Sequence, residues 1–502
     1  MTEFQDAGRT LIVGGLVLDA ARNAPERLDI LLEGNRIVDL FSSTPAGLDG
    51  VRRLDATNRL VIPGLVNAHT HSHFTFGKGV NPNWSLELHQ NATPGVTGGQ
   101  RAEDLHLCAQ LAAAEMVLKG CTSCYDLVVQ LPFPTDEGTG AIVSGYEAVG
   151  LRAVVALTIA DQTIWKAIPG LLASLPTESQ RLVNEIVAAP FDATLSACQR
   201  QLRQWPARSE LVRPAIAPTI PFLCSADFIR GAQRLAEAYG APLHTHLAES
   251  KVQARVALAR FDRSLVAHLE TLGYLGPNLT VAHAIWADKD DIRRLAAHGV
   301  SVAHCPTSNM RLGNGIAPVR EMVDSGINVG IGTDACTCSD QLNMFEAMRL
   351  ASFASRIRSA DFTRWLSAAQ VMRMATMGGG SALGLGNVGA IRLGYLADLV
   401  LLDLDHINYV PLNDALTQLV FGENGAAVAS VVINGELVLN EGCFTRIDYP
   451  TLITRVRASN ERLREENAKR AAEFRAIEPL VGAFCIGLAR EPHHVNRYLD
   501  SN

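Results

Sequence analysis

The chain has 502 residues, of which 48% are hydrophobic and 19% charged, a composition typical of a folded globular protein with a large core. Its net charge is −7, and no cluster of Lys and Arg is placed to follow a phosphate backbone, which argues against nucleic-acid binding. The first residues show no basic segment followed by an apolar one, and no apolar run approaches the roughly 18 residues that span a bilayer. We therefore expect a cytoplasmic protein without membrane or nucleic-acid partners.

Short strand-like runs occupy both ends of the chain. Residues 10–65 alternate between apolar and polar side chains, and Gly34 with Asn35 predicts the turn of a hairpin. The same strand-like alternation of apolar and polar residues occurs at residues 387–442. We expect one small β-sandwich domain built from both chain ends, residues 1–65 and 385–445.

Between these ends, strand-like runs alternate with segments of helical periodicity. The expected strands are residues 65–68, 123–127, 153–159, 212–216, 243–246, 280–283, 301–304 and 328–332. Eight strands, each followed by helix, predict an α/β fold in which residues 66–384 form a (β/α)8 TIM barrel. In that fold the chemistry lies at the carboxyl ends of the strands.

The remaining residues, 446–502, are expected to be a C-terminal helical extension. The extension begins as a helix with charges of both signs and continues into an apolar run at residues 480–488. Two interpretations stay open: the run caps the barrel, or it is buried in a partner subunit. The second predicts a homodimer or homotetramer.

Ten cysteines scattered through a long chain favour reduced thiols. Cys121 and Cys124 have no second pair at zinc-finger spacing, and we interpret them as structural. Cys336 and Cys338 follow Asp334, and we expect them in a pocket wall.

Polar side chains follow several of the expected strands. His69 and His71 end the first, and alternation in a strand places residues i and i+2 on one face. Two adjacent imidazoles are half of a divalent metal site. Matching groups end later apolar runs, namely His246, Glu249, His283 and Asp334.

These motifs together resemble the amidohydrolase superfamily. The chain reads Pro-Gly-Leu-Val-Asn-Ala-His-Thr-His up to His71, His-Leu-Ala-Glu up to Glu249, Ala-His up to His283, Ala-His-Cys-Pro-Thr-Ser-Asn around His304 and Gly-Thr-Asp up to Asp334. The resemblance extends over roughly residues 11–436. It is strongest to the mononuclear aminohydrolase branch, which includes guanine, 8-oxoguanine and adenosylhomocysteine deaminases and triazine hydrolases.

The resemblance implies one divalent metal ion per chain, zinc or alternatively ferrous iron, with the ligands His69, His71, His246 and Asp334. It selects His246 over His244, because the ligand lies three residues before the glutamate, and His244 is expected to be an ordinary barrel residue. A binuclear site in this superfamily often has a carboxylated lysine on strand four. Residues 212–222 contain no lysine, which favours one metal ion.

The same resemblance implies catalytic roles for three residues. Asp334 takes a proton from a water whose pKa the metal lowers. His283 hydrogen-bonds the nucleophile or the developing oxyanion, and Glu249 protonates a ring nitrogen and later the leaving amine.

Four further residues are candidates for substrate binding: Trp84, Thr219, His304 and Cys338. Trp84 lies in a Gly-, Pro- and Asn-rich stretch, residues 81–99, that we expect to be a mobile cover of the site. Thr219 stands where adenosine-type relatives have histidine, and Cys338-Ser339 replaces their usual Ser-Asn.

The expected function is hydrolytic deamination of an aminated nitrogen heterocycle, a free purine or pyrimidine base or a triazine, with release of ammonia. The alternative is hydrolysis of an amide, urea or halide substituent on a similar ring. Thr219 disfavours a nucleoside such as adenosine or adenosylhomocysteine. A metal-free assembly protein is disfavoured because every ligand is present.

Overall fold

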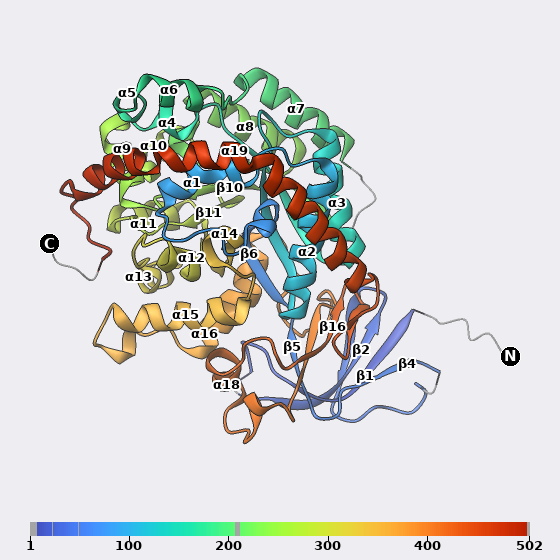
Figure 1. Ribbon diagram of the computed structural model, residues 1–502. Coiled ribbons are helices and arrows are strands. Elements are labelled where there is room, and N and C mark those ends of the chain that lie inside the picture. Colours follow the sequence, from blue (N-terminus) through green and yellow to red (C-terminus); the bar gives the residue numbers. More distant parts are fainter. Residues whose placement is uncertain (1–7, 23, 49, 206–210, 499–502) are drawn as a thin grey trace.

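The computed structural model describes residues 8–22, 24–48, 50–205 and 211–498. The fold is mixed α/β, with one parallel sheet surrounded by helices and a separate sheet below it in Figure 1. The expected absence of a secretory signal concerns residues 1–6, which lie outside the described residues.

All eight strands expected in the centre of the chain are present. They are β6 (Leu65–His71), β7 (Cys121–Val129), β8 (Arg152–Ile159), β9 (Val212–Pro218), β10 (Leu243–Leu247), β11 (Leu279–His283), β12 (Ser301–His304) and β13 (Val329–Ile331), followed by the short β14 (Asp334–Ala335).

Neighbouring strands of this sheet are parallel, in the order β13-β12-β11-β10-β9-β8-β7-β6-β14. β13 and β14 are separated by only Gly332 and Thr333, yet they lie at opposite ends of this order. The sheet therefore curls until β14 pairs with β6, with Asp334 opposite Thr70. This curled parallel sheet fits a TIM-like barrel.

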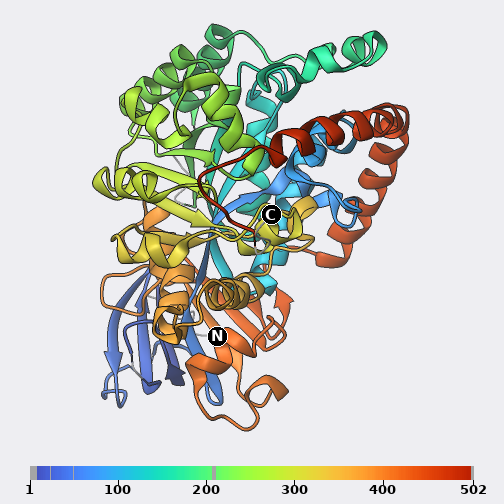
Figure 2. The same ribbon diagram turned by 90° about the vertical axis from the view of Figure 1, so that its left-hand side faces the viewer.

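Helices connect and cover the strands of the curled sheet (Figure 2). They are η1 (Ser72–Gly77), α1 (Leu86–Val96), α2 (Ala102–Leu118), α3 (Asp136–Val149), α4 (Ile164–Ala167), α5 (Leu171–Ser174), α6 (Thr177–Asn184), α7 (Phe191–Gln204), η2 (Pro221–Leu223), α8 (Ala226–Tyr239), α9 (Lys251–Phe261), α10 (Leu265–Thr271), α11 (Lys289–Ala297), α12 (Pro306–Arg311), α13 (Val319–Asp324), α14 (Cys336–Ser339), α15 (Met344–Ile357), η3 (Phe362–Arg364), α16 (Ala368–Arg373), η4 (Met374–Gly378) and α17 (Gly379–Ala382).

Helix α8 shows how local sequence sets these elements. Ser225 caps its first turn by accepting a hydrogen bond from the Phe228 amide, and Gly240 ends it in the left-handed conformation that favours glycine. Phe228, Ile229 and Leu235 form its buried face.

The second sheet unites both ends of the chain, as expected. Its strands are β1 (Arg9–Val17), β2 (Glu26–Glu33), β3 (Arg36–Phe41), β4 (Arg52–Asp55), β5 (Arg59–Pro63), β15 (Leu399–Asp403), β16 (Val428–Ile433), β17 (Glu436–Asn440) and β18 (Cys443–Phe444), with η5 (Ile407–Tyr409) and α18 (Ala415–Phe421) between them. The predicted hairpin of β2 and β3 is confirmed. Hydrogen bonding joins all the strands into one sheet that branches at β1, which pairs with β2, β4 and β5.

The helix α19 (Tyr449–Arg490) extends for 42 residues and crosses the barrel over α1, with further contacts to α2, α5 and α9 (Figure 1). On the inner side of α19, Val481 and Cys485 are buried, whereas Leu480 and Ile486 are 42% and 53% exposed. The apolar run therefore packs against neighbouring helices on one side and leaves apolar side chains exposed on the other. In the part of the chain that the structure describes, no helix combines the length and apolarity required to cross a membrane.

Residues 81–99, the stretch expected to be a mobile cover, are mostly helical, because Leu86–Val96 form α1, which packs against α19. A Cβ atom on Gly95 would lie 2.6 Å from the Cα atom of Ala471, so α1 and α19 touch backbone to backbone. Glycine permits that close approach.

Candidate metal centre and active site

The four expected metal ligands meet at the carboxyl end of the curled sheet. The ring nitrogens of His69, His71 and His246 include donor atoms that lie within 4.8 Å of one another, and all three side chains are buried. The Oδ1 atom of Asp334 lies 3.5 Å from Nε2 of His69 and 3.5 Å from Nε2 of His71. β6, β10 and β14 supply these residues.

The hydrogen bonds of two histidines test whether this set fits a metal ion. Nδ1 of His71 lies 2.7 Å from the carbonyl oxygen of Leu127, and Nδ1 of His246 lies 2.6 Å from that of Thr219. A carbonyl oxygen only accepts, so both Nδ1 atoms donate, and in the neutral rings both Nε2 atoms carry lone pairs. These Nε2 atoms face each other at 3.1 Å. Two facing lone pairs repel unless a cation binds them, so the residues fit a divalent ion.

The pKa values of the other two ligands are both lowered. Burial lowers the pKa of His69 to about 3, which keeps the imidazole neutral. Neither ring nitrogen of His69 has a hydrogen-bond partner among the described residues. Burial alone would raise the pKa of Asp334, but the His69 imidazole 3.5 Å away and the nearby imidazoles of His283 and His71 outweigh it and hold that pKa well below its usual range.

Glu249 and His283 lie against this set. Nε2 of His283 is 3.6 Å from Oε2 of Glu249 and 3.9 Å from Oδ2 of Asp334. Burial raises the pKa of Glu249 well above its usual range, and the charges of Asp334 and Glu87 raise it further. A carboxylic acid that retains its proton near neutral pH can act as a general acid.

Three residues in or next to the expected active site have unusual backbone conformations. His283, Ala284 and Asp334 have φ angles of 71°, 47° and 64°, in the left-handed region that non-glycine residues rarely adopt. Such residues cluster at functional sites, because the surrounding structure must offset their strain. Two of the three expected catalytic residues, His283 and Asp334, therefore have this left-handed backbone conformation.

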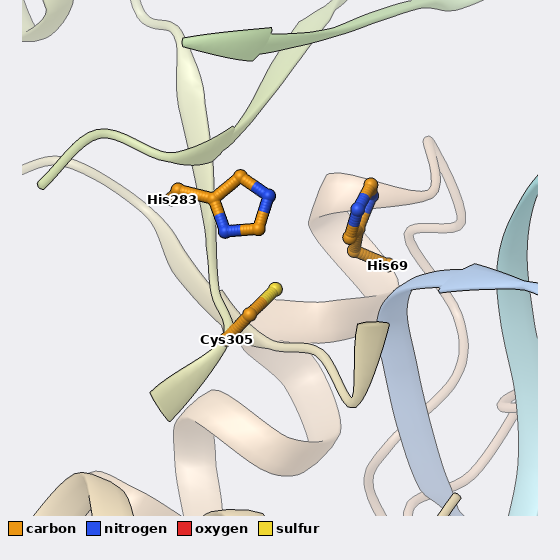
Figure 3. A group of neighbouring side chains, drawn as sticks. All are labelled: His69, His283 and Cys305. Carbon is orange, nitrogen blue, oxygen red and sulfur yellow. The ribbon is translucent and has the colours of Figure 1, made fainter. Parts of the chain in front are cut away.

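Figure 3 shows Cys305 beside His69 and His283, a neighbour that the sequence analysis did not single out. The three side chains offer donor atoms within 4.8 Å of one another. Burial raises the pKa of the Cys305 thiol well above its usual range, which favours the protonated thiol. A Cβ atom on Gly332 would lie 3.0 Å from the Cys305 sulfur and 2.8 Å from Cβ of His69, so this tight packing requires glycine.

A cavity of about 840 Å³ opens above the metal set. Thr219 and Cys338, two of the expected substrate-binding residues, line it together with Glu249. Trp165 and Arg470 of α19 also line it. The helical extension therefore contributes a residue to the cavity wall.

The other two expected substrate-binding residues lie elsewhere. Trp84 is only 7% exposed and is absent from the described residues that line the cavity. His304 is buried and faces a separate cavity of about 100 Å³ between helices, beside Arg320 of α13 and Arg358. Strand alternation explains its position, because Ala303 occupies the register of Ala282 and His246 in neighbouring strands and His304 follows on the opposite face.

Several residues that support the site were missed in the sequence. His89 of α1 lines the cavity, its Nε2 lies 2.7 Å from Oγ1 of Thr337, and burial lowers its pKa to about 4. Asn309 Oδ1 lies 3.0 Å from Nδ1 of His283, and Nδ2 of Asn314 donates to Oε1 of Glu249 at 3.1 Å. Asn309 belongs to the Ala-His-Cys-Pro-Thr-Ser-Asn motif, so the sequence contained a signal that could have identified it. His89 and Asn314 belong to no such motif.

The chain belongs to the amidohydrolase family, whose model matches residues 60–438. It is an enzyme of the hydrolase class acting on C–N bonds other than peptide bonds.

Individual relatives can be aligned with most of this chain. A 5-methylthioadenosine/S-adenosylhomocysteine deaminase from Pyrococcus abyssi is 30% identical over 444 residues, covering 88% of this chain and 96% of the relative. A 5'-deoxyadenosine deaminase from Methanosarcina barkeri is 31% identical over 447 residues, covering 88% and 92%.

Solved structures show the same fold. An adenosine deaminase from Xanthomonas campestris with bound zinc superimposes with a TM-score of 0.78 at 27% identity, covering 91% of this chain and 98% of that one. An atrazine chlorohydrolase from Arthrobacter aurescens complexed with zinc gives a TM-score of 0.80 at 24% identity, covering 90% and 100%. The second likeness concerns the fold alone.

Proposed function

We propose that the chain is a mononuclear metal-dependent aminohydrolase that removes an amino group from a nitrogen heterocycle as ammonia. His69, His71, His246 and Asp334 would hold one divalent ion, zinc or alternatively ferrous iron. The observation that carries this proposal is the pair of Nε2 atoms of His71 and His246, which face each other at 3.1 Å with both Nδ1 atoms engaged elsewhere. β9 contains no lysine that could bridge a second ion.

The proposed architecture is a closed (β/α)8 TIM barrel at residues 66–384, a β-sandwich from residues 1–65 and 385–445, and a helical extension at residues 446–502. Pairing of β14 with β6 supports the closure. The branching of the other sheet at β1 and the shared apolar cluster that includes Ile12, Val61 and Leu399 support a two-layered arrangement.

The bound ion would supply a nucleophile at neutral pH by lowering the pKa of a water. Asp334, whose pKa is held low, accepts the proton of that water. Glu249 keeps its proton because its pKa is raised, and it donates this proton to a ring nitrogen of the substrate. The resulting carboxylate then takes a proton from the hydroxyl group on the tetrahedral carbon and delivers it to the departing amine, and the proton held by Asp334 returns to Glu249. His283, fixed by Asn309, hydrogen-bonds the oxygen that enters.

The substrate ring has two candidate classes. Thr219 in the cavity wall, where adenosine-type relatives have histidine, favours a free base or a triazine. The nucleoside class is the second candidate, because relatives at 30% and 31% identity are named as deaminases of adenosine derivatives. The cavity of about 840 Å³ also has room for more than one ring.

Ammonia release from a panel of metal-loaded reactions tests this proposal. The panel contains aminated purines and pyrimidines, triazines, adenosine, 5'-deoxyadenosine and adenosylhomocysteine, with chloride and alkylamine release measured in parallel. Ammonia in proportion to the substrate consumed supports deamination. Turnover that releases only chloride or alkylamine would contradict deamination. Faster turnover of the nucleosides than of every free base and triazine would assign the substrate to the nucleoside class.

A further inference from the structure

The segment that follows α19, residues 491–498, returns to the barrel and lies against two loops of the site. Nε of Arg255 donates to Oε2 of Glu491 at 2.9 Å, and Nε2 of His494 lies 2.8 Å from Oδ2 of Asp288. The ring of Trp286 contacts Tyr498, with centroids 5.3 Å apart. These contacts bind the segment to the surface just beyond β11.

Arg497 is the point at which this segment joins the two loops. Its Nε donates to the carbonyl oxygen of Ile285 at 2.7 Å, and its Nη2 donates to that of Ala287 at 2.5 Å. Its own carbonyl oxygen accepts from the amide of Ile316 at 2.9 Å. Residues 284–288 and residues 313–316 are thus connected through one residue.

The second of these loops has Asn314 next to the contact. A Cβ atom on Gly315 would lie 2.9 Å from Cβ of Arg497, so the loop and the segment touch closely, and Gly315 has a φ of 108°. Asn314 is held on three sides. Its carbonyl accepts from Nε1 of Trp286 at 2.9 Å, its amide donates to the carbonyl of Asn309 at 2.8 Å, and its side chain donates to Glu249 at 3.1 Å.

We propose that Arg497 is a positioning residue for the reaction: by joining residues 284–288 to residues 313–316 it holds the Asn314 amide on the Glu249 carboxyl. Arg497 touches neither the metal set nor the cavity lining among the described residues. Guanidinium geometry suits this task, because its planar group holds the Nε and Nη2 donors in a fixed arrangement toward the two carbonyls. The proposal rests on the proposed role of Glu249.

Kinetics of the metal-loaded variant Arg497→Ala test the proposal. We expect kcat to fall about tenfold, the size of loss typical when an outer supporting contact is removed, with KM and metal content unchanged. Arg497→Lys, which keeps the charge but loses the fork, should lose less, and added guanidinium ion below denaturing concentrations should restore part of the Arg497→Ala rate. The control is Arg457→Ala on the exposed face of α19, which should behave as wild type.

A double-mutant cycle with Asn314→Ala separates positioning from general destabilisation. If Arg497 acts through Asn314, Arg497→Ala should change kcat little in the Asn314→Ala background. An unchanged kcat in the single Arg497→Ala variant, or an equal loss in both backgrounds, would overturn the proposal.

Amide hydrogen exchange gives a readout that needs no substrate. Faster exchange in residues 313–316 of Arg497→Ala, with α8 unaffected, is expected even if no compound in the panel is turned over. That combination would refute the proposed reaction and leave the loop connection standing. Unchanged exchange in residues 313–316 would refute the connection itself.

Discussion

His283 and His304 end adjacent parallel strands, yet their imidazoles lie in different surroundings. His283 lies 3.6 Å from Glu249 in the site, whereas His304 faces the small cavity beside Arg320 and Arg358. The register of β10, β11 and β12 places Ala282 and Ala303 on the same face as His246, so both histidines would point away from it. The left-handed backbone of His283, with a φ of 71°, turns only that side chain back into the site.

This difference predicts opposite results for two similar substitutions. His283→Ala should lower kcat about 100-fold, the loss typical when one donor to a developing oxyanion is removed. His304→Ala should leave kcat and KM close to the wild-type values, because its ring does not reach the main cavity. Steady-state kinetics of both metal-loaded variants check this. A raised KM for His304→Ala would contradict the prediction and show that His304 contributes to substrate binding.

The sequence predicted the strands and the polar groups at their ends because both signals are local. Alternation placed His69 beside His71, and the fold rule places strand-end residues at one mouth of a barrel. The local pattern failed for His304, since only the backbone angle at His283 distinguishes two similar strand ends. The alternation of side chains along a strand does not show which single residue adopts a left-handed backbone conformation.

Helix α1 and its His89 were missed for a different reason. The stretch has Pro94 and Gly95, which disfavour a helix locally, but Gly95 permits contact with Ala471, almost 400 residues later in the chain. The helix is therefore stabilised by a tertiary contact that no local window shows. The same holds for Arg497, whose loop partners are distant in sequence.

The metal content should be one divalent ion per chain. His69→Ala should lose the ion together with activity, because His69 supplies a buried imidazole that has no described hydrogen-bond partner. Elemental analysis of wild type, His69→Ala and the control His298→Ala, which alters a half-exposed imidazole far from the set, checks both statements. Two ions per active wild-type chain would refute the mononuclear site.

A buried ion pair joins the two sheets. Arg152 of β8 contacts Asp398 at 3.1 Å, and the side chains are 5% and 1% exposed. Arg152→Ala leaves Asp398 buried without its partner, so the free energy of unfolding should fall by about 3–5 kcal/mol. The exposed pair of Arg200 and Asp136 is the control, where Arg200→Ala should cost about 1 kcal/mol or less. Equal losses in urea unfolding of the two variants would contradict this assignment.

Self-association is expected from the outer face of α19. Leu480 and Ile486 of this helix remain exposed, 42% and 53%. We predict a homodimer or homotetramer at micromolar concentration, measured by light scattering, and a smaller species for the double variant Leu480→Glu with Ile486→Glu. A wild-type monomer would contradict the prediction.

The most direct test of the account is ammonia release by metal-loaded Glu249→Gln beside the wild type, on the best substrate of the panel. Glutamine keeps the shape and the contact with Asn314 but has no acidic proton to transfer, so the variant should retain its metal ion and lose about 100-fold or more in kcat. Because the active form of Glu249 is the protonated one, wild-type kcat/KM should fall as pH rises through its raised pKa. Near-normal ammonia release by a metal-loaded Glu249→Gln enzyme would contradict the account.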